Sequence, residues 1–301
     1  MAEYKKKSAT THITSTNGVQ LAFHDFGGVG DPLLLSHATG FHASCFAPIA
    51  TLLSEQFRCM GIDYRGHGDS QAIDPVDLKW TDYGDDAITA ARAMFAGASN
   101  TPLIGVGHSM GGAALLYAAM HEPHLFRALF VYEPIVFPPG GIRAEGSPNP
   151  MVEAARKRRT TFDSYDAAIA NFASKPPMMS FDAVAREAYV RHGFAQQSDG
   201  TVELKCRPAT EARTYETGGS APQWHELSSI KTPTWVMAGV QQPSQASSIS
   251  PLVAEQLPLG TYVQWDELGH FGPFEHPAHI AGFVGRTVAT LTTSFASRQI
   301  Q

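Results

Sequence analysis

The sequence predicts an α/β fold built around a mostly parallel β-sheet. Short apolar runs alternate with helical patterns along most of the 301 residues, which is typical of consecutive βα units. Hydrophobic residues make up 43% of the chain, enough for a large buried core. The alternation stops near Phe137 and resumes after Pro222, so we expect one core that is interrupted by an inserted segment.

The elements of the core follow from the pattern in chain order. Seven apolar runs predict strands, over residues 19–26, 32–37, 57–63, 102–107, 128–133, 233–239 and 261–267. A helix is expected over residues 81–97, capped by Thr81 or Asp82 and ended by Gly97. Another helix is expected over residues 111–121, directly after the fourth strand.

The inserted segment has a different character. It contains helical patterns but no convincing strand, and turn-forming stretches such as "FPPGG" and "SKPPMM" interrupt it. We interpret it as a helical cap over one edge or end of the sheet. The predicted organisation is an N-terminal part of the core at 1–136, the cap at 137–222 and a C-terminal part of the core at 223–301.

Composition narrows the classes of function. The formal charge of −6 gives no electrostatic reason to bind nucleic acid or anionic lipid, and the basic run at 156–159 is expected to face water. No apolar stretch approaches the ~20 residues that span a membrane, and the start of the sequence lacks the apolar segment of a secretory signal. Three cysteines without a CxxC pair support no disulfide framework. We therefore expect a cytoplasmic protein with a small-molecule substrate.

Ser109 is the leading candidate for a catalytic residue. It lies in "LIGVGHSMGGAALL", where a strand turns abruptly into a helix within a G-x-S-x-G pattern. Glycines at 107 and 111 relieve the crowding of such a turn, which projects the serine oxygen away from the sheet. The backbone N–H of Met110, at the start of the helix, is aimed at whatever bonds to that oxygen. The glycine spacing does not fit a dinucleotide-binding fingerprint.

A neutral serine needs a base, and His270 is the best placed of the 13 histidines. It follows the last predicted strand in the Gly-rich stretch "DELGHFGPFEHP". Other histidines are expected in the core or at the surface, namely His12, His24, His121, His124, His192, His225 and His279. The stretch "HEPH" at 121–124 lacks the spacing of a zinc-binding helix, so no metal is expected.

Four stretches in this order resemble the α/β-hydrolase superfamily: "SHATGF" at 36–41, "GIDYRGHGDS" at 61–70, "GHSMGG" at 107–112 and "LGHFGPFEHP" at 268–277. The resemblance extends from about residue 19 to 300. It implies an eight-stranded, mostly parallel sheet, a cap inserted after the sixth strand and an active site between the core and the cap.

One part of that family's catalytic triad is missing from its usual place. Many members carry the acid after the seventh strand, where this sequence reads "AGVQQPSQ" and offers no carboxylate. Glu133 ends the predicted strand at 128–133, which corresponds to the sixth strand of the eight-stranded family fold. Some branches of the superfamily place the acid after that strand. The order Ser109, Glu133, His270 matches the family's Ser…Asp/Glu…His order. Asp266 and Glu267, beside the histidine loop, are the alternatives for the acid.

The resemblance also implies an oxyanion hole and a pocket. In "HATG", Ala38 replaces the usual first glycine, the N–H of Thr39 would be the second donor beside that of Met110, and His37 anchors the loop. An apolar pocket is suggested by a set of residues in and near the cap: Phe41, His108, Phe137, Met178, Met179 and Trp224.

Serine at the turn favours acyl transfer, whereas the dehalogenases and epoxide hydrolases of this superfamily use aspartate there. The sequence therefore predicts a cofactor-independent serine hydrolase that cleaves a small to medium, apolar ester or lactone. Carbon–carbon bond hydrolysis or perhydrolysis would use the same triad. A ligand-binding receptor with a degraded triad is the alternative outside enzymes.

Overall fold

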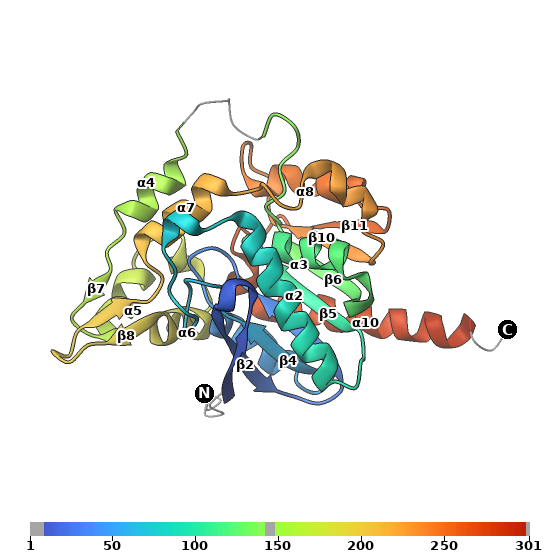
Figure 1. Ribbon diagram of the computed structural model, residues 1–301, viewed down its shortest axis with the longest axis horizontal. Coiled ribbons are helices and arrows are strands. Elements are labelled where there is room, and N and C mark those ends of the chain that lie inside the picture. The colour runs from blue at the N-terminus through green and yellow to red at the C-terminus, as the bar shows by residue number, and fades with distance from the viewer. Residues whose placement is uncertain (1–8, 142–147, 299–301) are drawn as a thin grey trace.

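The computed structural model describes residues 9–141 and 148–298, and its centre is a twisted sheet between helices (Figure 1). Eight strands follow the order β1-β2-β4-β3-β5-β6-β10-β11. All neighbours from β4 to β11 are parallel, and β2 runs antiparallel to both of its neighbours. The strands are β1 (Ala9–Thr14), β2 (Gln20–Gly27), β3 (Asp31–Ser36), β4 (Phe57–Ile62), β5 (Leu103–His108), β6 (Phe126–Tyr132), β10 (Thr234–Ala238) and β11 (Gly260–Gln264).

The predicted sheet is confirmed, and all seven predicted strands are present within a few residues of their expected ends. The sequence pattern missed β1, which pairs with β2 along the edge of the sheet. Five of its six residues are exposed, so it carries no apolar run. Its β-branched threonines were the available signal.

Helices cover both faces of the sheet. On one face lie α2 (Trp80–Gly97), α3 (Met110–His121) and α8 (Ala246–Gln256), and on the other α1 (Ala47–Leu53) packs against α10 (Pro277–Arg298). The short α9 (Gly272–Glu275) precedes α10. Short 3-10 turns complete the core: η1 (Thr16–Gly18), η2 (Ala43–Phe46), η3 (Pro75–Asp77), η4 (Pro123–Leu125) and η6 (Trp224–Ser229).

The start of α2 differs from the expectation. The helix begins at Trp80 with Lys79 as its N-cap, so neither Thr81 nor Asp82 is the capping residue. The carboxylate of Asp82 still serves the helix start, because it accepts a hydrogen bond of 2.9 Å from the backbone N–H of Lys79. The helix thus begins one residue earlier than expected, at Trp80, whose side chain is buried.

The inserted segment follows β6, the sixth strand of the sheet, as expected, but it is not purely helical. A three-stranded antiparallel sheet in the order β7-β9-β8 lies within it, which corrects the expectation of no strand. These strands have only two or three residues each, too few to show an alternating pattern. The elements are α4 (Pro150–Arg156), β7 (Thr161–Phe162), α5 (Tyr165–Ala173), η5 (Met178–Ser180), α6 (Ala183–Gly193), β8 (Phe194–Gln196), β9 (Val202–Leu204) and α7 (Pro208–Thr217).

The basic run at 156–159 also departs from the expectation. Arg156, Lys157 and Arg159 are exposed, but the side chain of Arg158 is only 21% exposed and pairs with Glu211 of α7. A largely buried cation needs such a partner, and the sequence pattern does not show it. The boundaries of the cap at residues 137 and 222 stay a prediction.

Two simpler expectations concern the chain as a whole. Cys45, Cys59 and Cys206 are free and buried. Among the described residues, no helix is both long and apolar enough to cross a lipid bilayer.

Candidate active site

The turn at Ser109 is strained in the way that the glycine pattern predicts. Ser109 joins β5 to α3 with φ 55° and ψ −116°, a conformation that L-residues rarely adopt. A Cβ atom at Gly107 would lie 2.8 Å from the carbonyl oxygen of Gly111. A Cβ atom at Gly111 would lie 2.3 Å from the carbonyl oxygen of Ser36 in β3. Glycine at both positions is therefore a steric requirement of the turn.

Backbone hydrogen bonds hold this turn in place. The N–H of Ser109 donates to the carbonyl of Tyr132 at the end of β6, 2.9 Å away, and the carbonyl of Ser109 accepts from Ala113 at 3.1 Å. Met110 is the first residue of α3, so its N–H has no acceptor inside the helix and is available to a ligand. The side chain of Met110 is buried in the core.

His270 and Glu133 are in direct contact. Nδ1 of His270 lies 2.6 Å from Oε2 of Glu133, and the second carboxylate oxygen, Oε1, accepts a 3.0 Å hydrogen bond from the N–H of Gly239. Glu133 is fully buried, with φ 44°, directly after β6. Gly239 directly follows β10, at the site where the family usually carries its acid. That segment supplies a backbone donor that orients the acid from the neighbouring strand.

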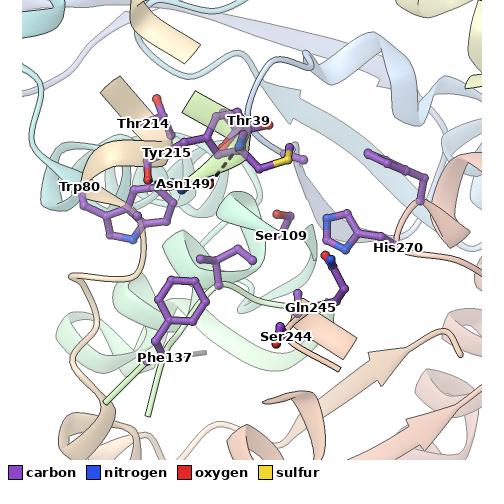
Figure 2. Close-up of a pocket in the computed structure, with 17 residues that line it drawn as sticks. Thr39, Trp80, Ser109, Phe137, Asn149, Thr214, Tyr215, Ser244, Gln245 and His270 are labelled. Atoms are coloured by element: carbon purple, nitrogen blue, oxygen red, sulfur yellow. Dashed lines mark hydrogen bonds between the residues drawn. The ribbon is translucent and has the colours of Figure 1, made fainter. Parts of the chain in front are cut away.

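Ser109 and His270 line the same cavity (Figure 2). The alternative acids are directed elsewhere. Asp266 contacts the side chain of Gln264, and Glu267 lies 3.6 Å from His279. The structure thus brings the serine, the histidine and Glu133 together, and it leaves the two alternatives exposed.

Three side chains hold the loop of His270. The hydroxyl of Tyr132 donates to the carbonyl of Gly269 at 2.7 Å, and a carboxylate oxygen of Glu275 accepts from the N–H of Gly269 at 2.7 Å. Nε2 of His108 lies 2.8 Å from the carbonyl of His270 and donates to it. Because burial, with His270 nearby, holds the pKa of His108 well below 6.5, this imidazole is neutral. His108 therefore supports the loop, and it does not line the cavity.

The loop that carries Thr39 is a tight turn. The N–H of Phe41 donates to the carbonyl of Ala38 at 3.1 Å, and Gly40 has φ 76°, as a turn with glycine in its third position requires. His37 anchors the turn from the core. Its Nε2 accepts from the backbone N–H of Tyr64 at 3.0 Å, so its Nδ1 carries the proton and donates to the carbonyl of Ala38 at 2.8 Å. Burial lowers the pKa of His37 to about 3, which keeps this tautomer neutral.

The cavity has a volume of about 280 Å³ and lies between the core and the inserted segment. Its lining is mostly apolar or neutral: Ala38, Thr39, Trp80, Ser109, Ile135, Phe137, Gly141, Asn149, Met151, Thr214, Tyr215, Gly218, Ser244, Gln245, Ala246, His270 and Phe271. Figure 2 shows Trp80 and Phe137 on the far side from His270. Among the described lining residues there is no lysine, arginine, aspartate or glutamate.

The suggested pocket residues have mixed positions. Phe137 lines the cavity. Phe41 and Met178 are instead buried in the packing between the core and the cap, and Met179 is 55% exposed. Trp224, the first residue of η6, packs against the core. Residue type alone indicated apolar surfaces here, but it did not indicate which way each side chain points.

The structure also shows a polar network around the buried His24 and Asp63. His24 Nε2 lies 2.9 Å from Asp63 Oδ2, and the Asp63 carboxylate also accepts from the backbone N–H groups of Ala43 and Asp69. His24, Asp63 and Asp69 have the spacing of a metal site. However, Asp69 already pairs with the Lys205 ammonium at 2.5 Å, and the Asp63 carboxylate already accepts several hydrogen bonds. We therefore interpret the group as structural.

Ionisation of this network follows from its contacts. Burial alone would lower the pKa of His24, but the Asp63 carboxylate outweighs it and raises that pKa above 6.5. Burial alone would raise the pKa of Asp63, but His24 and the neighbouring imidazoles outweigh it and lower that pKa well below its usual range. Each partner thus favours the charged form of the other.

The sequence of this chain matches that of a known protein family. A profile described as "Alpha/beta hydrolase family" matches residues 33–281, which is most of the chain. The chain belongs to the alpha/beta hydrolase family.

The two curated relatives described here match this chain over short stretches. It is 30% identical over 104 residues to (E)-2-((N-methylformamido)methylene)succinate hydrolase of Acinetobacter baylyi, covering 35% of this chain and 38% of that protein. It is 32% identical over 95 residues to protein phosphatase methylesterase 1 of Homo sapiens, covering 31% of this chain and 24% of that protein. The chain thus spans less than two fifths of the length of each of these two relatives.

A solved structure matches this chain over nearly its whole length. The peroxisomal alpha-beta-hydrolase Lpx1 of Saccharomyces cerevisiae superposes with a TM-score of 0.76 at 14% identity, covering 96% of this chain and 89% of that one. At that identity the likeness concerns the fold alone.

Sequence reasoning missed several residues that line the cavity. Ile135 follows β6, and Ser244 and Gln245 follow β10, so the rule that sites gather at the carboxyl ends of parallel strands was a usable signal. Trp80 and Tyr215 had no such signal. Trp80 is a helix-starting residue, and Tyr215 reaches the cavity only because α7 folds over the core.

Proposed function

We propose that this hydrolase cleaves small to medium-sized, uncharged carboxylic esters or lactones through an acyl-enzyme on Ser109. The observation that carries the proposal is the 2.6 Å contact between His270 and the buried Glu133, together with the position of Ser109 and His270 in the lining of one cavity. A carboxylate on Nδ1 leaves the lone pair of Nε2 free to accept the serine proton. No other described acid is in contact with that imidazole.

The reaction proceeds in two halves. Ser109 Oγ attacks the carbonyl carbon while His270 takes its proton, and the N–H groups of Met110 and Thr39 stabilise the oxyanion. The alkoxide leaves with the proton from His270, which forms the acyl-enzyme. A water molecule, deprotonated by the same imidazole, then attacks the ester carbonyl and releases the acid and Ser109.

The cavity supports the choice of substrate. Its volume of about 280 Å³ lies just below the range of about 300–1,000 Å³ typical of pockets for drug-sized ligands, which favours a small substrate. One relative's name specifies a succinate, a dicarboxylate that calls for cationic partners. The described lining offers no lysine or arginine. Another relative's name specifies a methylesterase, which accords with an ester substrate.

A fluorophosphonate probe followed by mass spectrometry tests the nucleophile. We expect one adduct, on Ser109, and turnover of nitrophenyl esters that declines as the acyl chain outgrows the cavity. Ser109→Ala should abolish both while circular dichroism shows an intact fold, and Ser228→Ala, at an exposed serine, should leave them unchanged.

Other outcomes point to the alternatives. Cleavage of 1,3-diketones without ester turnover would indicate a carbon–carbon bond hydrolase, and peracid formation would indicate a perhydrolase. Failure of the wild-type protein to react with the probe would indicate a ligand-binding protein and refute the proposal.

A further inference from the structure

A largely buried ion pair lies in the cap, close to the active site. Nη1 of Arg158 donates to both carboxylate oxygens of Glu211, at 2.9 and 2.7 Å. The side chains are 21% and 7% exposed. Nη2 of Arg158 also contacts the hydroxyl of Tyr189 in α6. The cluster thus joins the segment after α4 with α6 and α7.

Stability alone is a poor explanation for such a cluster. Taking two charges out of water is costly, and well-packed apolar side chains in their place are often as stabilising or more so. A buried pair that is not needed for stability is best understood from what it contacts.

The pair contacts the turn that carries Thr39. A Cβ atom at Gly40 would lie 2.7 Å from Oε1 of Glu211 and 3.2 Å from Nη1 of Arg158, so the backbone of Gly40 rests directly on the two charged groups. The next residue is also held from the cap, because the rings of Phe41 and Tyr189 lie 5.2 Å apart. Both residues that follow Thr39 therefore pack against this cluster.

The other side of the turn is fixed by the core. His37 donates to the carbonyl of Ala38, the residue before Thr39. The turn is therefore clamped between an imidazole of the core and an ion pair of the cap. An oxyanion donor must lie within about 2.7–3.1 Å of the place where negative charge develops, so small displacements of this turn matter.

We propose that Arg158 and Glu211, with Tyr189, are positioning residues that hold the turn of residues 38–41 so that the N–H of Thr39 can stabilise the oxyanion. This role rests on the proposed function. It also links the turn to the substrate, because α7 carries Glu211 and, one helical turn later, the cavity residues Thr214 and Tyr215.

The double variant Arg158→Met/Glu211→Leu separates positioning from folding. Because it leaves no unpaired buried charge, we expect its melting temperature to stay close to that of the wild type. Its kcat for nitrophenyl butyrate should fall about tenfold or more, toward the about 10²–10³-fold loss typical of a missing oxyanion donor. The KM should change far less, because the donor acts on the transition state. Binding of an arylboronic acid, which places a tetrahedral oxygen in the oxyanion hole, should weaken with kcat.

A second pair in the same two regions serves as the matched control. Arg156 and Glu216 lie 2.5 Å apart, with side chains 55% and 31% exposed. We expect Arg156→Met/Glu216→Leu to leave kcat, KM and boronate affinity unchanged. An equal loss of kcat in the control would point to a general disturbance of the cap and overturn the assignment.

A conservative variant tests the positioning role if the double variant does not fold. Arg158→Lys keeps the charge but not the fork of donors, and we expect a lowered kcat with a nearly unchanged KM. A wild-type kcat in the folded double variant, or in folded Arg158→Lys, would overturn the positioning role. Absence of ester turnover by the wild-type protein would instead overturn the proposed function, and this role with it.

Discussion

Replacing Glu133 by glutamine would present His270 with an amide that cannot replace both hydrogen bonds of the carboxylate. The present carboxylate accepts from His270 Nδ1 at 2.6 Å and from the N–H of Gly239 at 3.0 Å. If the amide oxygen faces Gly239, the NH₂ group faces Nδ1 and forces the histidine proton onto Nε2. That tautomer cannot accept the proton of Ser109.

The opposite orientation of the amide is no better. The NH₂ group would then face the N–H of Gly239, leaving two buried donors unpaired at a cost of about 1–3 kcal/mol each. In either orientation, no negative charge remains to stabilise the imidazolium formed during acyl transfer. We therefore expect kcat to fall by about 10³- to 10⁴-fold, which corresponds to about 4–5.5 kcal/mol of transition-state stabilisation.

Steady-state hydrolysis of nitrophenyl butyrate measures this loss, and thermal unfolding shows whether the variant is folded. The control is Asp266→Asn, which changes the exposed carboxylate near the histidine loop and should leave kcat unchanged. Near-full activity of Glu133→Gln, together with loss of activity in Asp266→Asn, would refute the assignment of the acid.

Two further predictions concern the turn and the polar network. Gly111→Ala would place a Cβ atom 2.3 Å from the carbonyl oxygen of Ser36, so we expect a loss of about 1–3 kcal/mol or more in unfolding free energy and a lower kcat. The control Gly97→Ala, whose Cβ atom would have nothing within 4 Å, should not lower the unfolding free energy. Equal urea midpoints for the two variants would contradict this prediction. His24 has a higher pKa in the folded state than the value of 6.5 in the unfolded chain. Its pairing with Asp63 therefore stabilises the fold fully below pH 6.5, and this stabilisation is lost as the pH rises through the folded-state pKa. His24→Gln should therefore flatten the decline in urea midpoint between pH 6 and 9, and an unchanged decline would contradict the pairing.

Much of the fold could be predicted from local patterns. Seven of eight strands in the main sheet appeared as apolar runs because a parallel sheet buries both faces of its strands, as the fully buried β5 shows. The exposed β1 and the two- or three-residue strands of the cap escaped, because their pairing depends on partners elsewhere in the chain. The turn at Ser109 was visible because its steric demands fall on glycines at fixed positions on either side.

The candidate site was predictable only in part. Glu133 could be suggested from its place at a strand end and from the lack of a carboxylate after the seventh strand. Its alternatives, Asp266 and Glu267, differ from it in direction and burial, which no local pattern encodes. The same limit explains why five of six suggested pocket residues lie outside the cavity, and why Arg158 was expected in water.

By itself, the sequence determined the order of strands and helices, the strained turn and the kinds of side chain available to the site. Those features depend on residues a few positions apart, through backbone sterics and apolar periodicity. Only the tertiary structure decided which carboxylate meets His270, which residues line the cavity and which charged pair of the cap rests against the turn at Thr39. Each of these contacts joins residues that are far apart in the chain, and its energy depends on direction, distance and exclusion of water, which arise only when the chain is packed.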